Sequence, residues 1–241
     1  MSNFAHLSRQ PGDASQRDLY GIVLLTAVAA VVLSMFSAQI AVEGGVLERM
    51  AVPGRMLLLV VLATSLLRAS GVSWRDSGLR APPSFWRSST LVIGGYFVVG
   101  AAFVLVSQIL LPALGATHDS GRIFSELRGN LGEYLYWLIP IAWGSAALGE
   151  ELVFRGYLQG RLEHVLGSTR GAPLLAAIGQ AVIFGSLHLY LGIGGAIVAG
   201  TTGFILGLVY LAGGRNLWPC IILHGLIDTI TLTAIYTGAA N

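Results

Sequence analysis

Residues 134–158 read YLYWLIPIAWGSAALGEELVFRGYL, an apolar run that ends in two adjacent glutamates and an arginine. A run of about 20 apolar residues can cross the roughly 30 Å hydrocarbon core of a bilayer as a helix. Within that core every backbone amide must be hydrogen-bonded by the protein itself, which favours a helix over an open strand. This stretch therefore predicts a membrane helix with ionisable groups near one end.

The rest of the chain has the same composition. Of 241 residues, 54% are hydrophobic and 11% are charged, and the mean hydropathy is +0.73. A soluble domain of ordinary composition is much less apolar. The single cysteine, Cys220, has no partner for an intrachain disulfide. All 14 basic residues are arginines scattered along the chain, so a nucleic-acid partner is not expected. The bilayer is the predicted partner.

Seven apolar runs are predicted to span the membrane: residues 19–42, 50–67, 90–114, 134–154, 172–191, 193–211 and 217–236. The predicted fold is therefore all-α, a polytopic transmembrane helix bundle of about seven spans, with a range of about six to eight. The second run is the weakest, because Pro53 and Arg55 interrupt its start and Arg68 limits its end. No repeat or linker divides the chain, so residues 1–241 are predicted to form one membrane domain.

The distribution of arginine predicts the orientation. With the N-terminus in the cytoplasm, ten of the 14 arginines fall on the cytoplasmic side and four outside, as the positive-inside rule requires. Residues 71–89, which contain Trp74 and Trp86, are expected along the inner membrane surface, and residues 116–133 are expected to form an external loop. The absence of lysine and the short chain favour a bacterial protein of the inner membrane.

Ionisable side chains within the apolar runs are the candidate functional residues, because a charge in the bilayer is costly and usually faces a cavity or a partner. Arg155 follows Glu151 by four residues, which predicts a structural ion pair on one helical face. Glu150 points about 100° away from Glu151 and has no charged mate at helical spacing. Glu150 is therefore predicted to be free for proton transfer.

Two histidines and an aspartate lie on later runs. His188 follows Phe184 by four residues, and His224 precedes Asp228 by four, so His224 and Asp228 share a helical face. Together with Glu150, these groups can deprotonate a water and stabilise the oxyanion formed when it attacks an amide. The same four side chains could instead bind a divalent metal such as zinc, with a water in the open position.

Three motifs resemble those of the CAAX protease and bacteriocin-processing (CPBP, or Abi) family of intramembrane peptidases. Residues 150–158, EELVFRGYL, resemble its first motif, in which an arginine follows the second of two glutamates by four residues. Residues 184–188, FGSLH, resemble the second motif, and residues 224–228, HGLID, resemble the third. All three occur in the family's order within residues 137–236, the expected catalytic core.

The resemblance implies a role for each of the four polar residues. Glu150 is the general base that activates water, His188 and His224 bind or orient that water, and Asp228 assists oxyanion stabilisation. Glu151, Arg155 and Phe184 are expected to support the site structurally. The family includes members described as metallopeptidases and as metal-independent glutamate peptidases, so the cofactor is either a divalent metal or none.

Two features depart from a simple transfer of these roles. Eukaryotic members of the family carry Asn at the position of Asp228, and an ionised carboxylate cannot donate a hydrogen bond as Asn does. Asp228 must therefore be protonated, orient His224 or bind a metal. Helical rise also places Glu150 and His224 at a similar depth, about 10 Å from the cytoplasmic side, but puts His188 nearer the outer side. The site forms only if the embedded part of that helix starts near residue 178 or if the cavity is deep.

The favoured function is an endopeptidase that acts on a peptide or membrane-protein segment in a cavity open to the cytoplasm. One alternative is a non-catalytic immunity or scaffold protein that keeps the peptidase fold, since a lone intramembrane histidine often only bonds neighbouring helices. The other is a proton-coupled transporter that uses Glu150 and the histidines as a relay. Inverted repeats with broken helices, typical of transporters, are not found in the sequence.

Overall fold

The computed structural model describes residues 11–34, 46–117 and 125–239, and within these ranges it is helical without any strand. The all-α prediction is confirmed. Residues 35–42 of the first predicted run and residues 118–124 of the predicted external loop lie outside the described residues. The elements, in chain order, are α1 (Pro11–Ser34), α3 (Val46–Ala69), α4 (Phe85–Leu105), η1 (Val106–Leu110), α5 (Leu111–Ala113), η2 (Ser125–Leu127), α6 (Leu131–Tyr136), η3 (Trp137–Gln159), α7 (Gly160–Leu166), α8 (Ala172–Leu187), η4 (Leu189–Leu191), α9 (Gly192–Ala212) and α10 (Trp218–Thr237).

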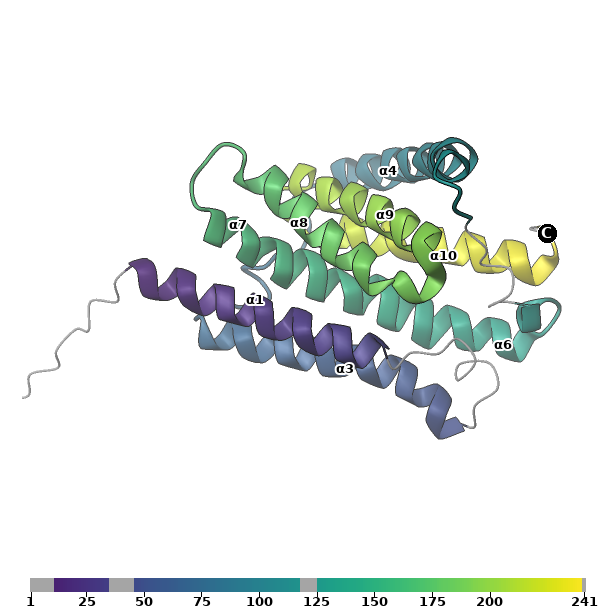
Figure 1. The fold of residues 1–241 in the computed structure, drawn as a ribbon, viewed down its shortest axis with the longest axis horizontal. Coiled ribbons are helices and arrows are strands. Elements are labelled where there is room, and N and C mark those ends of the chain that lie inside the picture. Colours follow the sequence, from purple (N-terminus) through teal and green to yellow (C-terminus); the bar gives the residue numbers. More distant parts are fainter. Residues whose placement is uncertain (1–10, 35–45, 118–124, 240–241) are drawn as a thin grey trace, which may run out of the picture.

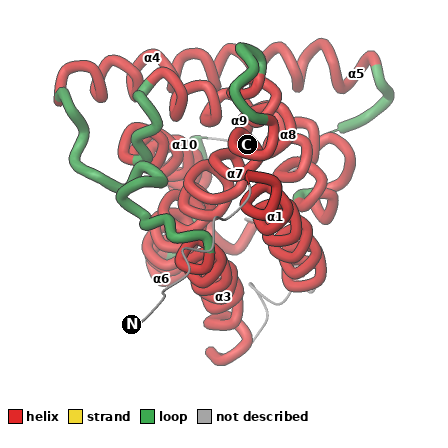
Figure 2. Tube along the Cα trace, turned by 90° about the vertical axis from the view of Figure 1, so that its left-hand side faces the viewer, coloured by secondary structure: helices red, strands yellow, loops and turns green. Residues whose placement is uncertain are grey.

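A long central rod, formed by α6, η3 and α7, runs from Leu131 to Leu166 and organises the other helices (Figure 1). The backbone at both junctions is right-handed helical, with φ −68° and ψ −37° at Trp137 and φ −63° and ψ −39° at Gly160, so the rod does not break. In Figure 1, α1 and α3 lie below the rod, and α8, α9 and α10 lie above it. Figure 2 shows α4 running across the other helices.

Five helices in the described part of the chain are long and apolar enough to cross a membrane, and the protein is an integral membrane protein. Their spans are Ser15–Val32, Arg49–Ala69, Phe85–Ala113, Leu189–Ala212 and Trp218–Thr237. The other two predicted runs are helical but do not meet the same criteria. α8 has 16 residues, or about 24 Å at the usual helical rise, and η3 contains Glu150, Glu151 and Arg155. The predicted number of about seven spans therefore stays a prediction.

One predicted boundary is wrong, and one predicted run belongs to a longer helix. Pro53 and Arg55 do not interrupt the second run, because both lie inside α3, whose candidate span starts at Arg49. The fourth run is part of a longer helix, because the rod continues from residue 154 to Leu166. Hydropathy ends a span where charges begin, but here Arg155 and Gln159 are completely buried among neighbouring helices. The helix can continue because other helices, and not lipid, surround it there.

Glycine allows close packing at several points of the rod and of α9. A Cβ atom added at Gly203 would lie 2.9 Å from the Phe184 ring, and one at Gly207 would lie 2.9 Å from the Gln180 amide nitrogen. A Cβ at Gly156 would lie 3.1 Å from Trp74, whereas one at Gly160 would meet nothing within 4 Å. Small residues at these crossings let α8, α9 and η3 approach one another. That approach brings the polar side chains of three helices together.

Candidate active site

Glu150, His188, His224 and Asp228 all line one cavity of about 360 Å³. Glu150 comes from η3, His188 from the C-terminal end of α8, and His224 and Asp228 from α10. The volume lies within the range of small-molecule sites in proteins. The structure thus brings together all four residues that the sequence singled out, from three helices that are distant in the chain.

The structure explains how His188 reaches the same site as Glu150, although helical rise had placed His188 nearer the outer side of the membrane. That placement assumed that Glu150 lies near the cytoplasmic end of its helix and that residues 172–191 form one full span. Glu150 instead lies well inside the rod, which continues to Leu166, and α8 ends at Leu187. His188 caps α8 with φ −95° and ψ 10°, and its ring opens onto the same cavity as Glu150.

Phe184, one helical turn before His188, holds the His188 ring in place. The Phe184 carbonyl oxygen lies 2.8 Å from His188 Nδ1, and because a carbonyl only accepts, Nδ1 carries a proton. The two rings are packed with their centroids 4.5 Å apart. The other His188 nitrogen, Nε2, is left for the cavity. The spacing of the second motif therefore has a direct physical reason, since four residues place the carbonyl and the imidazole one turn apart.

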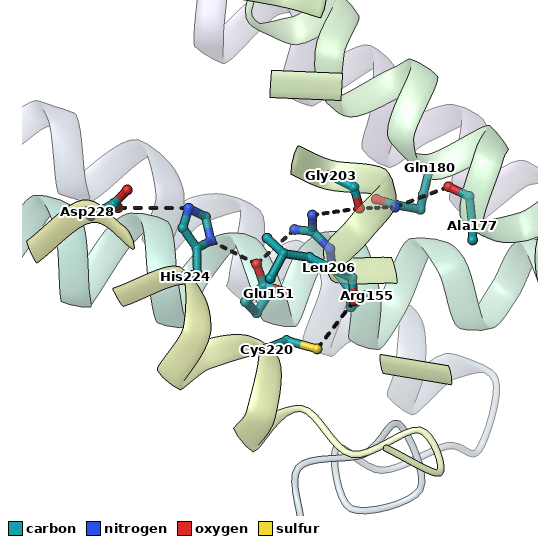
Figure 3. Close-up of polar contacts among 9 residues, drawn as sticks. All are labelled: Glu151, Arg155, Ala177, Gln180, Gly203, Leu206, Cys220, His224 and Asp228. Carbon is teal, nitrogen blue, oxygen red and sulfur yellow. Dashed lines mark hydrogen bonds and ion pairs between the residues drawn. The ribbon is translucent and has the colours of Figure 1, made fainter. Parts of the chain in front are cut away.

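Glu151 lies on the other face of η3 and connects two helices. Its Oε1 atom accepts a hydrogen bond from Arg155 Nη1 at 2.9 Å, and both side chains have 0% exposure. The predicted ion pair is therefore present. The same oxygen lies 2.8 Å from His224 Nδ1, a bond that the sequence did not predict. Figure 3 shows Glu151 between Arg155 and His224.

His224 has a carboxylate on each side of its ring. Nδ1 faces Glu151, and Nε2 lies 3.8 Å from Asp228 Oδ2 on the next turn of α10. A carboxylate that bonds one imidazole nitrogen fixes the orientation of the ring and presents the other nitrogen to the site. The structure thus gives Glu151 and Asp228 different positions about one histidine.

The Arg155 side chain continues this buried polar network toward α8 and α9. Nη2 donates to the Gly203 carbonyl at 3.1 Å, and Gln180 Nε2 donates to the same carbonyl at 2.8 Å (Figure 3). The guanidinium also lies over the Phe184 ring, 5.0 Å from its centroid, which is a cation–π contact. Phe184 therefore contacts both Arg155 and His188, and it links the first motif to the second.

Sequence reasoning missed Gln180 and Arg55 as parts of this region. Gln180 is the only amide side chain in α8 and is completely buried, and a polar residue inside an apolar run is a signal that could have found it. Arg55 was treated only as an interruption of its run, although it lines the cavity. Glu150, by contrast, forms no ion pair and no hydrogen bond with another side chain in the described ranges.

The proposed metal ligands do not form a metal site as they are placed. Among the described residues, no group of three or more His, Cys, Asp or Glu side chains is arranged to hold a metal ion. His224 Nδ1 and His188 Nδ1 are bonded to Glu151 and to the Phe184 carbonyl, so Nε2 is the nitrogen of each ring that is left for a water molecule or another ligand.

The model of one protein family, described as type II CAAX prenyl endopeptidase Rce1-like, matches residues 132–230. No curated protein sequence and no solved structure matches the chain. The matched segment contains all three motifs and the four cavity residues. This match supports the resemblance to the CAAX protease and bacteriocin-processing family that the motifs predicted.

Proposed function

We propose that the protein is an intramembrane endopeptidase in which Glu150 activates a water molecule within the cavity. The observation that supports this most strongly is the convergence of Glu150, His188, His224 and Asp228 on one cavity. Proximity of a carboxylate and two imidazoles is what general acid–base catalysis requires. The family match over residues 132–230 supports the reaction class.

In the proposed reaction, Glu150 removes a proton from water, and the resulting hydroxide attacks the carbonyl carbon of the scissile peptide bond. His188, whose Nδ1 is held by the Phe184 carbonyl, accepts a hydrogen bond from the water through Nε2. The carbonyl oxygen becomes an oxyanion. Glu150 then returns its proton to the leaving nitrogen, so that one water and one peptide bond become a carboxylic acid and an amine.

His224 is the group best placed to donate a hydrogen bond to the oxyanion. Its Nδ1 bonds Glu151, and its Nε2, which lies 3.8 Å from Asp228 Oδ2 and so beyond hydrogen-bond distance, is left to donate. Asp228, 3.8 Å from His224 Nε2, orients that nitrogen and does not itself donate. This assignment gives Asp228 a positioning role and accounts for the acidic residue where eukaryotic relatives carry Asn.

The proposed substrate is a prenylated peptide or protein C-terminus that enters the cavity. The matching family, described as a CAAX prenyl endopeptidase, supports this class of substrate. The arginine distribution supports a cytoplasmic N-terminus in a bacterial inner membrane. A C-terminal alkaline phosphatase fusion is expected to be active in bacteria, because an odd number of spans places the C-terminus outside; an inactive fusion with an active cytoplasmic reporter would reverse the orientation.

The test of the proposed function is cleavage of a farnesylated CAAX peptide by the purified protein in lipid nanodiscs, with products identified by mass spectrometry. Glu150→Gln is expected to lower the rate by about a thousandfold while the protein still folds. Glu163→Gln is the matched control, since Glu163 pairs with Arg215 outside the cavity. Equal rates for wild type and Glu150→Gln would overturn the mechanism, and absence of cleavage by the wild type would favour the scaffold alternative.

A further inference from the structure

Arg55 on α3 lies on the wall of the same cavity as Glu150. Its Nη1 atom is buried and has no hydrogen-bond partner, and Arg55 forms no ion pair with any acidic side chain in the described part of the chain. A guanidinium in a membrane protein is costly to bury without an anion. The structure therefore places on the cavity wall a half-buried cationic group for which the described residues supply no anionic partner.

A second arginine on the same helix, Arg49, has both an anionic and an aromatic partner. Arg49 makes two hydrogen bonds of 2.7 Å to the two carboxylate oxygens of Glu133, and it lies 4.0 Å from the centroid of the Tyr136 ring. Arg49 is thus held by the rod through a bidentate pair. Arg55, less than two turns further along α3, has no such pair among the described residues.

Met56, which follows Arg55, indicates where Arg55 lies relative to Glu150, the proposed catalytic base. Met56 packs directly on Gly149, where an added Cβ would collide with the Met56 side chain. Gly149 immediately precedes Glu150 on η3. Arg55 and Glu150 therefore open onto one cavity from two helices in contact, and Arg55 is the only Arg or Lys among the residues that line it.

The remaining lining suits a ligand with an apolar body and an anionic end. Much of the wall is apolar, as shown by the side chains of Trp137, Ile141, Phe184, Leu187, Leu191 and Leu232. Carboxylate is the anion that a guanidinium binds in bidentate geometry, and a peptide C-terminus carries it without any acidic side chain. An apolar peptide end meets both requirements at once.

We propose that Arg55 is a specificity-determining residue that binds the C-terminal carboxylate of the peptide substrate and so restricts cleavage to bonds near a free chain end. This inference rests on the proposed peptidase function, because it assigns one more contact to the same substrate. Arg55 takes no part in the proton transfers. Its contribution is to select and place the peptide relative to Glu150.

The test compares two farnesylated CAAX peptides that differ only at the end, one with a free carboxylate and one with a C-terminal amide. Binding is measured by fluorescence anisotropy to the Glu150→Gln protein in phosphatidylcholine nanodiscs, so that no cleavage occurs. We expect the carboxylate peptide to bind at least about tenfold more tightly, and we expect Arg55→Gln on this background to reduce the preference to less than about twofold. Arg68→Gln, the same change on the same helix outside the cavity, is expected to keep the preference.

Several outcomes separate this inference from the proposed function. Equal binding of the two peptides, or binding of neither, overturns the carboxylate site. This comparison does not depend on whether an Arg55 variant folds. Arg55→Lys, which keeps the charge, should retain part of the preference for the carboxylate peptide. Preferential binding without cleavage by the wild type leaves the Arg55 site standing and contradicts only the peptidase. If phosphatidylglycerol in the nanodiscs raises the thermal stability only when Arg55 is present, and the peptides bind equally, the anion is a lipid headgroup and the proposal is wrong.

Discussion

Glu150 and Glu151 are adjacent and chemically identical, yet they lie in two different regions of the molecule. Glu150 lies on the cavity wall, partly accessible, and no other side chain in the described ranges bonds it. Glu151 is completely buried and bonds both Arg155 and His224. A rotation of about 100° per residue separates a free carboxylate from a fixed one.

The comparison shows that η3 has two functionally different faces. The face of Glu150, here called the reactive side, carries polar groups that converge on the cavity. The face of Glu151, here called the supporting side, bonds neighbouring helices. On the supporting side, each polar group bonds the next, from His224 through Glu151 and Arg155 to the Gly203 carbonyl. Changes on the first side should alter the rate alone, whereas changes on the second should alter stability as well.

Glu151→Gln should have the largest combined effect. It removes the charge that holds Arg155 and His224, and a buried guanidinium left without its anion costs on the order of 3 kcal/mol. We expect a clearly lower thermal unfolding midpoint and a rate reduced by about ten- to a hundredfold. Glu150→Gln should leave the midpoint unchanged. Equal unfolding midpoints for the two variants would break the distinction between the two sides of η3.

Gly203→Ala should perturb the supporting side by overpacking. The new methyl group would lie 2.9 Å from the Phe184 ring and 3.5 Å from Arg155 Nη2, and such crowding costs about 1 to 3 kcal/mol. We expect a lower unfolding midpoint together with weaker cleavage, because Phe184 also holds His188. Gly100→Ala is the control, since nothing lies within 4 Å of its added Cβ. If both variants unfold at the wild-type temperature, close packing at Gly203 is not important.

Phe184→Leu tests whether the Phe184 ring connects the two sides of the site. The change keeps an apolar side chain but removes the ring under Arg155, a contact that contributes about 1 kcal/mol, and the ring packed on His188. The Phe184 carbonyl is retained, so the hydrogen bond to His188 Nδ1 should persist. We expect a rate reduction of only about tenfold in the peptide assay. Loss comparable with that of Glu150→Gln would mean that the ring itself, and not only the carbonyl, orients His188.

Asp228→Asn should have the smallest effect. The amide oxygen keeps a hydrogen-bond acceptor in the position beside His224 Nε2, and the change introduces the residue found in the eukaryotic relatives. We expect a rate within about tenfold of the wild type, measured beside Asp228→Ala, which removes the acceptor and should be slower. A thousandfold loss with Asn would show that the charge of Asp228 is needed for proton transfer, which contradicts its positioning role.

The local pattern of the sequence was sufficient to predict the fold class and the side-chain pairs within single helices. The length and apolarity of the runs predicted an all-α membrane protein, because a bilayer leaves the backbone few alternatives to helix. Helical periodicity alone predicted the Glu151–Arg155 pair and the shared face of His224 and Asp228, since residues four apart are neighbours on any helix. The three motifs were sufficient to predict the family.

Only the tertiary structure decided how the helices face one another. The bond between Glu151 and His224 joins residues 73 positions apart, and it depends on the rotation of η3 against α10. The same holds for Arg55 on the cavity wall and for the burial of Arg155 and Gln159 among neighbouring helices. Sequence spacing defines the faces of each helix, but the contacts between faces depend on packing, and packing is a property of the whole chain.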